Sequence, residues 1–518
     1  MNLSNEINKI ITNINNNKFK EAIHSCENLI NLNIENTIVY NLYGRAYQSL
    51  GLYEKSIPKL ERSIQLQKNN YFALNNLAVS FKATEKYKLS EEAYKECLKI
   101  NPNYIVAIIN YANLKEFLNE IDEAIKLNLS ALELQLNNSH DYILSKLSKL
   151  YLSIGNIEEA RNYSLKLLKK YPNESYFYQL HSDVVDFEKD KNYLPNMEAL
   201  FNKKNPSDDD IINLSFPLGK AYEKLKNYKK AFNYFDKGNA YKKKKINFNI
   251  DDVLRLSSSI KKFFNSHNFQ KFKEKQIDKK IIFICGMPRS GTTLINQIIS
   301  SHTDVVSTGE SGHLGTYIKK NYLNNFLLNE RKISDDIDSN DNFFQDYVYN
   351  LFDEFKYISK VFTDKSVQNF FWIGFIKIFF PNSKIIITER NSKDICLSIF
   401  KNNFESTYMN FSYDQKDIAN FYNIYSDLIK FWKKTYENDL YSIKYENLIE
   451  NPEIEVRKML NYCGLKWDSN CLNHHQNKSA ITTASITQAR LPIYKSSKNL
   501  SHNYFAYLEQ MFNLLKNQ

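Results

Sequence analysis

The chain has 518 residues, well beyond the size at which a single hydrophobic core stops growing, so two or more domains are expected. Hydrophobic residues make up 43% and aromatic residues 14%, which excludes a largely disordered chain. The formal net charge of +11 is compatible with nucleic acid, an anionic membrane or a small anionic ligand, and does not choose among them.

The sequence carries no sign of a targeting or membrane segment. Its first twenty residues lack the apolar core of a signal peptide, and the longest aromatic and apolar run, 370–380, is short and interrupted by Lys377. The six cysteines form no CxxC pair and no Cys/His cluster at ligand spacing, so neither a zinc site nor a disulfide framework is indicated. We therefore expect a cytoplasmic protein without a membrane span.

The N-terminal half carries a repeat of 34 residues. Tyr53, Tyr87 and Ile121 recur at this spacing, and each is followed three residues later by Ser or Ala. This is the period of tetratricopeptide repeats, in which helix pairs stack into a superhelix with a concave face. The same register places small residues on both helices of each pair, where they let the helices approach closely: Gly44, Ala78 and Ala112 on the first, and Ser63, Cys97 and Ala131 on the second.

The repeat extends in both directions. Phe19 lies one period before Tyr53, Ile157 follows after a two-residue slip, and residues 216–239 hold a further pair that carries Tyr228. We count five clear units and disfavour an ordinary helical bundle, because several positions keep the register together. A protein or peptide ligand is expected on the concave face. The basic run at 242–245 lacks interleaved aromatic residues, so a solvated helix end fits it better than nucleic-acid binding.

From about residue 279 the pattern changes to short β-rich runs, two of them followed by helices that are expected to begin at Thr292 and Ser392. The runs are KKIIFICG, DVVSTGE and SKIIITER. This alternation predicts a parallel sheet with crossover helices, followed from about 411 by mostly helical structure. The predicted divisions are tetratricopeptide repeats at 1–172, an irregular helical segment and last repeat at 173–242, a connector at 243–278 and the α/β domain at 279–518.

The first predicted strand runs directly into a glycine-containing loop and a helix. The segment GMPRSGTTL, which starts at Gly286, gathers backbone N–H groups at a helix N-terminus, where an anion can bind. It matches the nucleotide P-loop GxxxxGK[ST] except that Thr292 replaces the lysine. That lysine serves the β- and γ-phosphates of ATP or GTP, so its absence and the presence of Arg289 favour a donor such as a 5′-phosphosulfate over a kinase or GTPase substrate. A glycine turn that only joins strand to helix is the alternative.

A second anion contact is predicted where the strand 384–388 ends. Arg390 follows this strand, and Ser398 lies eight residues further on the next helix. Ligands of open parallel sheets lie outside the carboxyl ends of the strands, and Arg390 shares that edge with the loop at Gly286. A surface salt bridge explains an arginine at a strand end equally well.

Two segments resemble the donor-binding elements of sulfotransferases, CGMPRSGTTLINQIISSHTDVVSTGES and TERNSKDICLSIF. The resemblance is closest to the tyrosylprotein type and to bacterial tetratricopeptide-sulfotransferase fusions. It extends over nearly the whole chain through KSVQNF, KYENLIENP, TTASITQARLPIYKSS and FPLGKAYEKLKNYKKAFNYFDKGN. It implies an all-α tetratricopeptide superhelix followed by an α/β, P-loop-like, parallel-sheet sulfotransferase domain.

The resemblance implies an enzyme that moves a sulfuryl group from 3′-phosphoadenosine 5′-phosphosulfate, without a metal, to a hydroxyl of a peptide tyrosine, a glycan or a small molecule. It implies catalytic roles for Glu310, Lys365 and Arg289. The other implied contacts are Arg289, Ser290, Gly291, Thr292 and Thr293 for the 5′-phosphosulfate, Arg390 and Ser398 for the 3′-phosphate, Tyr445 for the adenosine, Ser485 for the sulfate oxygens, and Lys498 as the one cation near the closing element.

Sulfuryl transfer needs a base for the incoming hydroxyl and a cation where the leaving phosphate gains charge, and the sequence offers both. Glu310 follows the predicted strand DVVST on the same sheet edge as the loop, although a lone glutamate in a turn is usually only solvated. Lys365 is the candidate cation, with an ion pair to Asp364 or a surface position as the alternatives. His313 is a second candidate base, for which a core or surface histidine is the better interpretation.

The sequence also departs from the family pattern. Ser366 and Val367 replace the usual Met-Pro or Pro after Lys365, Asn391-Ser392 replace Asp-Pro, and Leu500-Ser501 stand where a basic residue and Trp are expected. These departures leave open an alternative function. In it the repeats act as a scaffold, and the C-terminal domain binds the nucleotide with weak activity or none.

Overall fold

The computed structural model describes residues 2–134, 140–190, 192–266, 280–310, 312–323, 361–477, 479, 481, 483, 486–493 and 498–516. The chain divides into two compact units, Met1–Leu150 and Tyr151–Gln518. Across the described ranges, none of the helices has both the length and the apolar composition needed to cross a lipid bilayer.

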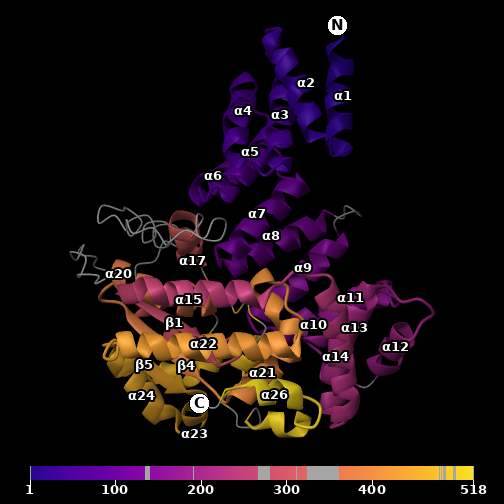
Figure 1. Cartoon of the computed structure of the whole chain (residues 1–518). Coiled ribbons are helices and arrows are strands. Elements are labelled where there is room, and N and C mark those ends of the chain that lie inside the picture. The colour runs from indigo at the N-terminus through magenta and orange to yellow at the C-terminus, as the bar shows by residue number, and fades with distance from the viewer. Residues whose placement is uncertain are drawn as a thin grey trace. The chain divides into compact units, whose positions relative to one another are not determined.

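The first unit is built from packed helix pairs (Figure 1). The pairs are α1 (Leu3–Asn15) with α2 (Phe19–Asn31), α3 (Thr37–Ser49) with α4 (Tyr53–Leu66), α5 (Tyr71–Ala83) with α6 (Tyr87–Ile100), and α7 (Ile105–Phe117) with α8 (Ile121–Glu133). The division between the units falls within α9 (His140–Ser153).

The 34-residue register coincides with the helix starts. Phe19, Tyr53, Tyr87 and Ile121 are the first residues of α2, α4, α6 and α8. The small residue three positions after each of them is fully buried: Ala22, Ser56, Ser90 and Ala124. Gly44 shows why the size matters, because a Cβ atom there would lie 2.5 Å from Cγ of Leu60 on the paired helix. The predicted tetratricopeptide superhelix is confirmed.

The second unit begins with further helices and continues into a sheet. The helices are α10 (Ile157–Lys170), α11 (Ser175–Ser182), α12 (Tyr193–Phe201), α13 (Asp208–Lys224), α14 (Tyr228–Lys244) and α15 (Ile250–Ser266). Ile157 and Tyr228 again start helices, as the register predicts, and α13 packs on α14. The run 242–245 ends α14, with Lys244 and Lys245 exposed, whereas Lys243 pairs with Asp417 on α22 (Gln415–Thr435).

The sheet has five parallel strands in the order β2-β3-β1-β4-β5. Their bounds are β1 (Lys280–Gly286), β2 (Val305–Ser307), β3 (Val361–Asp364), β4 (Lys384–Glu389) and β5 (Leu440–Lys444). The predicted parallel sheet is confirmed, but β3 and β5 were not foreseen. β3 has only four residues, and β5 is an edge strand in which Ile443 alone is fully buried, so neither shows a clear apolar run.

Helices and turns connect the strands and complete the unit. They are α16 (Thr292–Ser300), α17 (His313–Ile318), η1 (Lys319–Leu323), η2 (Val367–Phe371), α20 (Ile373–Phe379), α21 (Ser392–Phe400), η3 (Thr407–Tyr413), α22 (Gln415–Thr435), α23 (Tyr445–Glu450), α24 (Pro452–Tyr462), η4 (Ser469–Gln476), α25 (Ile486–Ala489), η5 (Leu500–Tyr504) and α26 (Glu509–Leu514). The predicted helices from Thr292 and Ser392 are confirmed.

Helix α15, from the segment predicted as a connector, packs along α22 beside the sheet (Figure 1). The ring of Phe264 lies 5.3 Å from that of Phe375 and 5.1 Å from that of Trp432, measured between centroids. Gly374 leaves room for this ring, since a Cβ atom there would overlap Phe264. The aromatic run 370–380 is therefore part of this core and not a surface feature.

The pair α13 and α14 also packs into the sheet-containing unit. Nδ2 of Asn239 on α14 donates a hydrogen bond of 2.8 Å to the carbonyl oxygen of Phe400 at the end of α21. The rings of Phe232 and Phe400 stack beside this bond. The last helix pair of the repeat pattern thus supports the helix that follows β4.

We predict that Phe264→Ala destabilises the second unit by about 3–5 kcal/mol, the usual cost of removing a buried phenylalanine. Leu254→Ala on the same helix is the control, because Leu254 is 51% exposed and surface substitutions usually change stability by less than about 0.5 kcal/mol. Urea unfolding followed by tryptophan fluorescence measures both. Equal losses for the two variants would show that α15 does not belong to this core.

Candidate functional site

The five strands end at one edge of the sheet, and a predicted site residue follows each of them. Glu310 lies three residues after β2, and Lys365 directly follows β3. The loop 287–291 follows β1, while Arg390 and Tyr445 directly follow β4 and β5. The strand order therefore sets the order of these groups along the edge, with Glu310 and Lys365 on one side of the loop and Arg390 and Tyr445 on the other.

The loop after β1 is held tightly against its neighbours. A Cβ atom on Gly286 would overlap the hydroxyl of Thr388 on β4, and Gly291, at φ +109°, would bring one to 2.9 Å from the ring of Tyr445. Arg289 also adopts a left-handed conformation, with φ +69°. The backbone thus takes a path that glycine permits, and it ends at the N-terminus of α16, where free backbone N–H groups can bind an anion.

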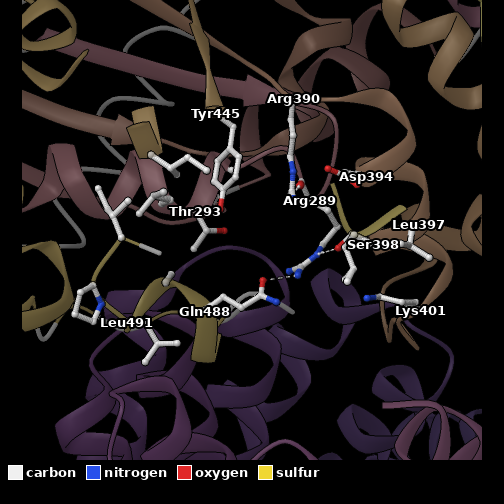
Figure 2. A pocket seen from close by; sticks show the side chains of 17 residues that line it. Arg289, Thr293, Arg390, Asp394, Leu397, Ser398, Lys401, Tyr445, Gln488 and Leu491 are labelled. Carbon is white, nitrogen blue, oxygen red and sulfur yellow. Dashed lines mark hydrogen bonds between the residues drawn. The ribbon is translucent and has the colours of Figure 1, made fainter. Parts of the chain in front are cut away.

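An open pocket lies beside this loop (Figure 2). Its polar lining consists of Arg289, Thr293, Arg390, Asp394, Ser398, Lys401, Tyr445 and Gln488. Its apolar lining consists of Leu294, Leu397, Ile449, Ala489, Leu491, Pro492, Ile493 and Leu500. Three cationic side chains and an aromatic ring therefore face one cavity.

Six of the predicted donor contacts line this pocket: Arg289, Gly291, Thr293, Arg390, Ser398 and Tyr445. Nε of Arg289 donates to Oγ of Ser398 at 2.9 Å, and Nη2 of Arg289 donates to Oε1 of Gln488 at 2.6 Å (Figure 2). Nη1 of Arg390 donates to the carbonyl oxygen of Arg289 at 3.2 Å. The Arg390 guanidinium lies 4.6 Å from the centre of the Tyr445 ring, a cation–π contact.

Ser290, Thr292 and Lys498 are not among the residues that line the pocket. The side chains of Ser290 and Thr292 are buried, and the Ser290 hydroxyl bonds that of Thr388. Thr293 lines the pocket and its hydroxyl lies 3.3 Å from that of Thr483. Lys498 pairs with Glu450. Ser485 lies outside the described residues.

Sequence reasoning missed three polar residues of the pocket, one of them on the helix that carries Ser398 and one at the C-terminal cap of that helix. Lys401 makes hydrogen bonds of 2.8 Å to both carboxylate oxygens of Glu223 on α13. Asp394 and Lys401 stand four residues before and three after Ser398, a spacing that puts all three on one helix face and could have revealed them. Gln488, on the short α25, carried no such signal.

Asp394 holds the element that contains Leu500. Its side chain is buried, and its two carboxylate oxygens accept hydrogen bonds from the backbone N–H groups of Asn499 at 2.8 Å and Ser501 at 2.9 Å. Leu500 between them lines the pocket. The departure at Leu500-Ser501 therefore supplies an apolar wall and a backbone anchor where a cation was expected.

Glu310 and Lys365 form a separate group that does not line this pocket. The ammonium of Lys365, whose side chain is only 3% exposed, pairs with Oε1 of Glu310. The Tyr408 hydroxyl donates to Oε2 of the same carboxylate at 3.0 Å. Lys365 is therefore neither a surface cation nor paired mainly with its neighbour Asp364. His313, the second candidate base, is the first residue of α17.

The hydrogen bonds of Ser366 explain its departure from the family pattern, which has Met-Pro or Pro after the lysine. Its hydroxyl accepts a hydrogen bond of 3.1 Å from the N–H of Gly312, and its own N–H donates to Asp364 at 2.9 Å. The N–H of Lys365 also donates to the carbonyl oxygen of Gly309 at 2.9 Å. A proline at 366 would lack the N–H. Ser366 thus helps to join the turn that carries Glu310 to the end of β3.

Two kinds of family model match the chain. Residues 282–469 match the sulfotransferase family, and residues 38–70, 73–104, 142–174 and 216–245 match tetratricopeptide repeats. The chain joins tetratricopeptide repeats to a domain of the sulfotransferase family. The resemblance inferred from the sequence motifs is confirmed.

Among known proteins, an uncharacterized protein of Aquifex aeolicus is 28% identical over 394 residues, which are 73% of this chain and 50% of that protein. The chain thus spans half the length of this relative. A putative protein-tyrosine sulfotransferase of Caenorhabditis briggsae is 23% identical over 204 residues, 38% of this chain and 70% of that protein. The C-terminal part of a tetratricopeptide protein from Cytophaga hutchinsonii superposes with a TM-score of 0.37 and 16% identity, over 45% of this chain and 95% of that one.

We predict that Asp394→Asn lowers the stability of the sulfotransferase domain by about 1.5–3 kcal/mol, because an amide offers one acceptor oxygen where the carboxylate serves two N–H groups. Asp427→Asn is the matched control, since Asp427 takes part in an exposed pair with Lys261, and such pairs contribute at most about 1 kcal/mol. Thermal unfolding measures the difference. A loss at position 427 as large as at 394 would contradict the anchoring role of Asp394.

Proposed function

We propose that the chain transfers a sulfuryl group from 3′-phosphoadenosine 5′-phosphosulfate to a hydroxyl acceptor. The convergence of Arg289, Arg390 and Ser398 with the ring of Tyr445 in one pocket carries this proposal. The match to the sulfotransferase family supports the class of reaction. The absence of a P-loop lysine at Thr292 supports a donor without a γ-phosphate.

The donor would span the pocket from the loop to α21. Backbone N–H groups at the start of α16 and the Arg289 guanidinium would bind the 5′-phosphosulfate, with Arg289 exchanging its bonds to Ser398 and Gln488 for the donor oxygens. Arg390, Ser398 and Lys401 would bind the 3′-phosphate. Because Glu223 already holds Lys401, the cation is kept near the pocket before the donor arrives.

In the proposed transfer, the acceptor oxygen forms a bond to sulfur while the bond from sulfur to the bridging phosphate oxygen breaks. Glu310 takes the acceptor's proton, and Lys365 and Arg289 stabilise the charge that develops on the leaving phosphate. The ion pair between Glu310 and Lys365 keeps both groups together at the sheet edge. Lys365 would turn from the carboxylate to the bridging oxygen as the proton is transferred.

The tetratricopeptide repeats add a proposed binding function. Their helix pairs form a superhelix of the kind that binds peptide or protein segments on its concave face. We propose that this surface binds a macromolecular partner, with an acceptor that carries the hydroxyl group as one candidate.

The donor assignment predicts that adenosine 3′,5′-bisphosphate binds without magnesium and that ATP binds more weakly, as measured by calorimetry in the presence of a chelator. Arg390→Ala should cost about 1.5–3 kcal/mol of binding free energy, the range for hydrogen bonds to charged groups, which is roughly a 10- to 150-fold rise in Kd. Stronger binding of ATP under these conditions would refute the assignment.

Arg457→Ala is a matched control for this experiment. Arg457 also lies over an aromatic ring, that of Trp467 at 3.7 Å, but it is not among the pocket residues. Its substitution should leave the Kd of the bisphosphate unchanged. A similar loss of affinity in both variants would indicate that the loss at Arg390 comes from destabilisation.

The catalytic assignment predicts that Glu310→Gln keeps its affinity for the bisphosphate and loses about 10²- to 10⁴-fold in turnover, because a base acts on the acceptor hydroxyl in the transition state. Release of the product nucleotide from labelled donor, with 4-nitrophenol as acceptor, measures turnover. His313→Gln should remain active. If Glu310→Gln remains active, another residue must act as the base. If the wild-type chain binds the bisphosphate but shows no turnover, the alternative of a binding protein is favoured.

A further inference from the structure

A tyrosine of this chain makes a hydrogen bond to the proposed base. The Tyr408 hydroxyl donates a hydrogen bond of 3.0 Å to Oε2 of Glu310, and Lys365 pairs with the other oxygen of the same carboxylate. A hydroxyl within about 2.6–3.2 Å of a general base has the geometry from which its proton is removed. The chain thus presents a phenol to Glu310 as an acceptor would.

The segment that carries Tyr408 is fixed by its own packing. In η3, Met409, Phe411 and Tyr413 are buried, and the ring of Phe411 stacks on that of Phe421 at 3.8 Å between centroids. The Tyr413 hydroxyl donates to the carbonyl oxygen of Phe404 at 2.8 Å and accepts from the Phe404 N–H. These contacts anchor the segment and leave the Tyr408 side chain at the surface, 39% exposed, beside Glu310.

The surroundings of Tyr408 disfavour loss of its phenolic proton. Burial, together with the nearby Glu310 carboxylate, raises the pKa of Tyr408 above its ordinary value. The oxygen therefore keeps its proton at neutral pH. The hydrogen bond to Glu310 provides a path by which that proton leaves as the oxygen attacks an electrophile.

We propose that Tyr408 is a sulfation site of this chain, modified by the chain's own transferase centre. The inference rests on the proposed function. The phenol oxygen forms a bond to the sulfur of the phosphosulfate donor, the bond from sulfur to the 5′-phosphate oxygen breaks, and the phenolic proton passes to Glu310. The products are a tyrosine O-sulfate and adenosine 3′,5′-bisphosphate.

This geometry also indicates the acceptor class of the centre, because Tyr408 is a peptide phenol in contact with Glu310. Sulfation would place a negative charge next to the Glu310 carboxylate, and like charges at this distance repel. The modified tyrosine would then leave the carboxylate.

The test incubates the full-length chain with radiolabelled phosphosulfate donor and no added acceptor, followed by proteolysis and mass spectrometry. We expect the mass of one SO3 group on the peptide that contains Tyr408, absent from Tyr408→Phe and formed at least about 100-fold more slowly in Glu310→Gln. Tyr176→Phe is the control, since Tyr176 is also exposed, at 37%, and belongs to the same compact unit. The first-order rate should not change with protein concentration.

A parallel assay with 4-nitrophenol separates failure of this inference from failure of the proposed function. Transfer to 4-nitrophenol with Tyr408 unmodified would overturn the inference and leave the proposed function intact. A modification rate that rises with protein concentration would overturn the intramolecular reaction. No transfer to either acceptor would overturn the proposed function, and the inference with it.

Discussion

Close packing of the loop after β1 against β4 and Tyr445 is the constraint on which the pocket depends. Neither Gly286 nor Gly291 has space for a side chain, because the Thr388 hydroxyl and the Tyr445 ring take that space. The backbone therefore runs within hydrogen-bonding reach of its neighbours and enters α16 directly. Arg289 is turned into the left-handed region at the same point, and its side chain extends to Ser398.

The order of the strands separates two groups of side chains along the edge of the sheet. The pocket with Arg390 and Tyr445 lies at the ends of β4 and β5, whereas Glu310 and Lys365 follow β2 and β3. The loop of β1, the central strand, lies between the two groups. In the proposed function, the donor would lie along the loop with its anionic groups near the arginines and its reacting end toward Glu310, since parallel strands bring their carboxyl ends to one edge.

The sequence predicted the features that repeat or that pack locally. Helix starts such as Tyr53 followed from the 34-residue period, and β1 and β4 from long apolar runs, whereas β3 and β5 were missed because they are short or at an edge. Motif spacing was enough to place Arg289, Arg390 and Ser398 at one edge of the sheet, and all three line one pocket. Roles that depend on distant partners, such as that of Lys401 with Glu223 or Tyr408 with Glu310, need tertiary contacts that no local pattern encodes. The domain boundaries and the roles of the site residues remain predictions.

Glu223, on a helix of the last repeat, contacts two residues of the sulfotransferase domain. Its carboxylate binds Lys401 and accepts from the Tyr504 hydroxyl at 2.7 Å, so a helix of the last repeat contributes to the wall behind the pocket. Removing that helix pair would leave Lys401 and Tyr504 without this carboxylate and would uncover Phe400. Recombination that exchanges repeat arrays between such proteins should therefore be tolerated upstream of α13, while α13 and α14 are inherited with the domain they support.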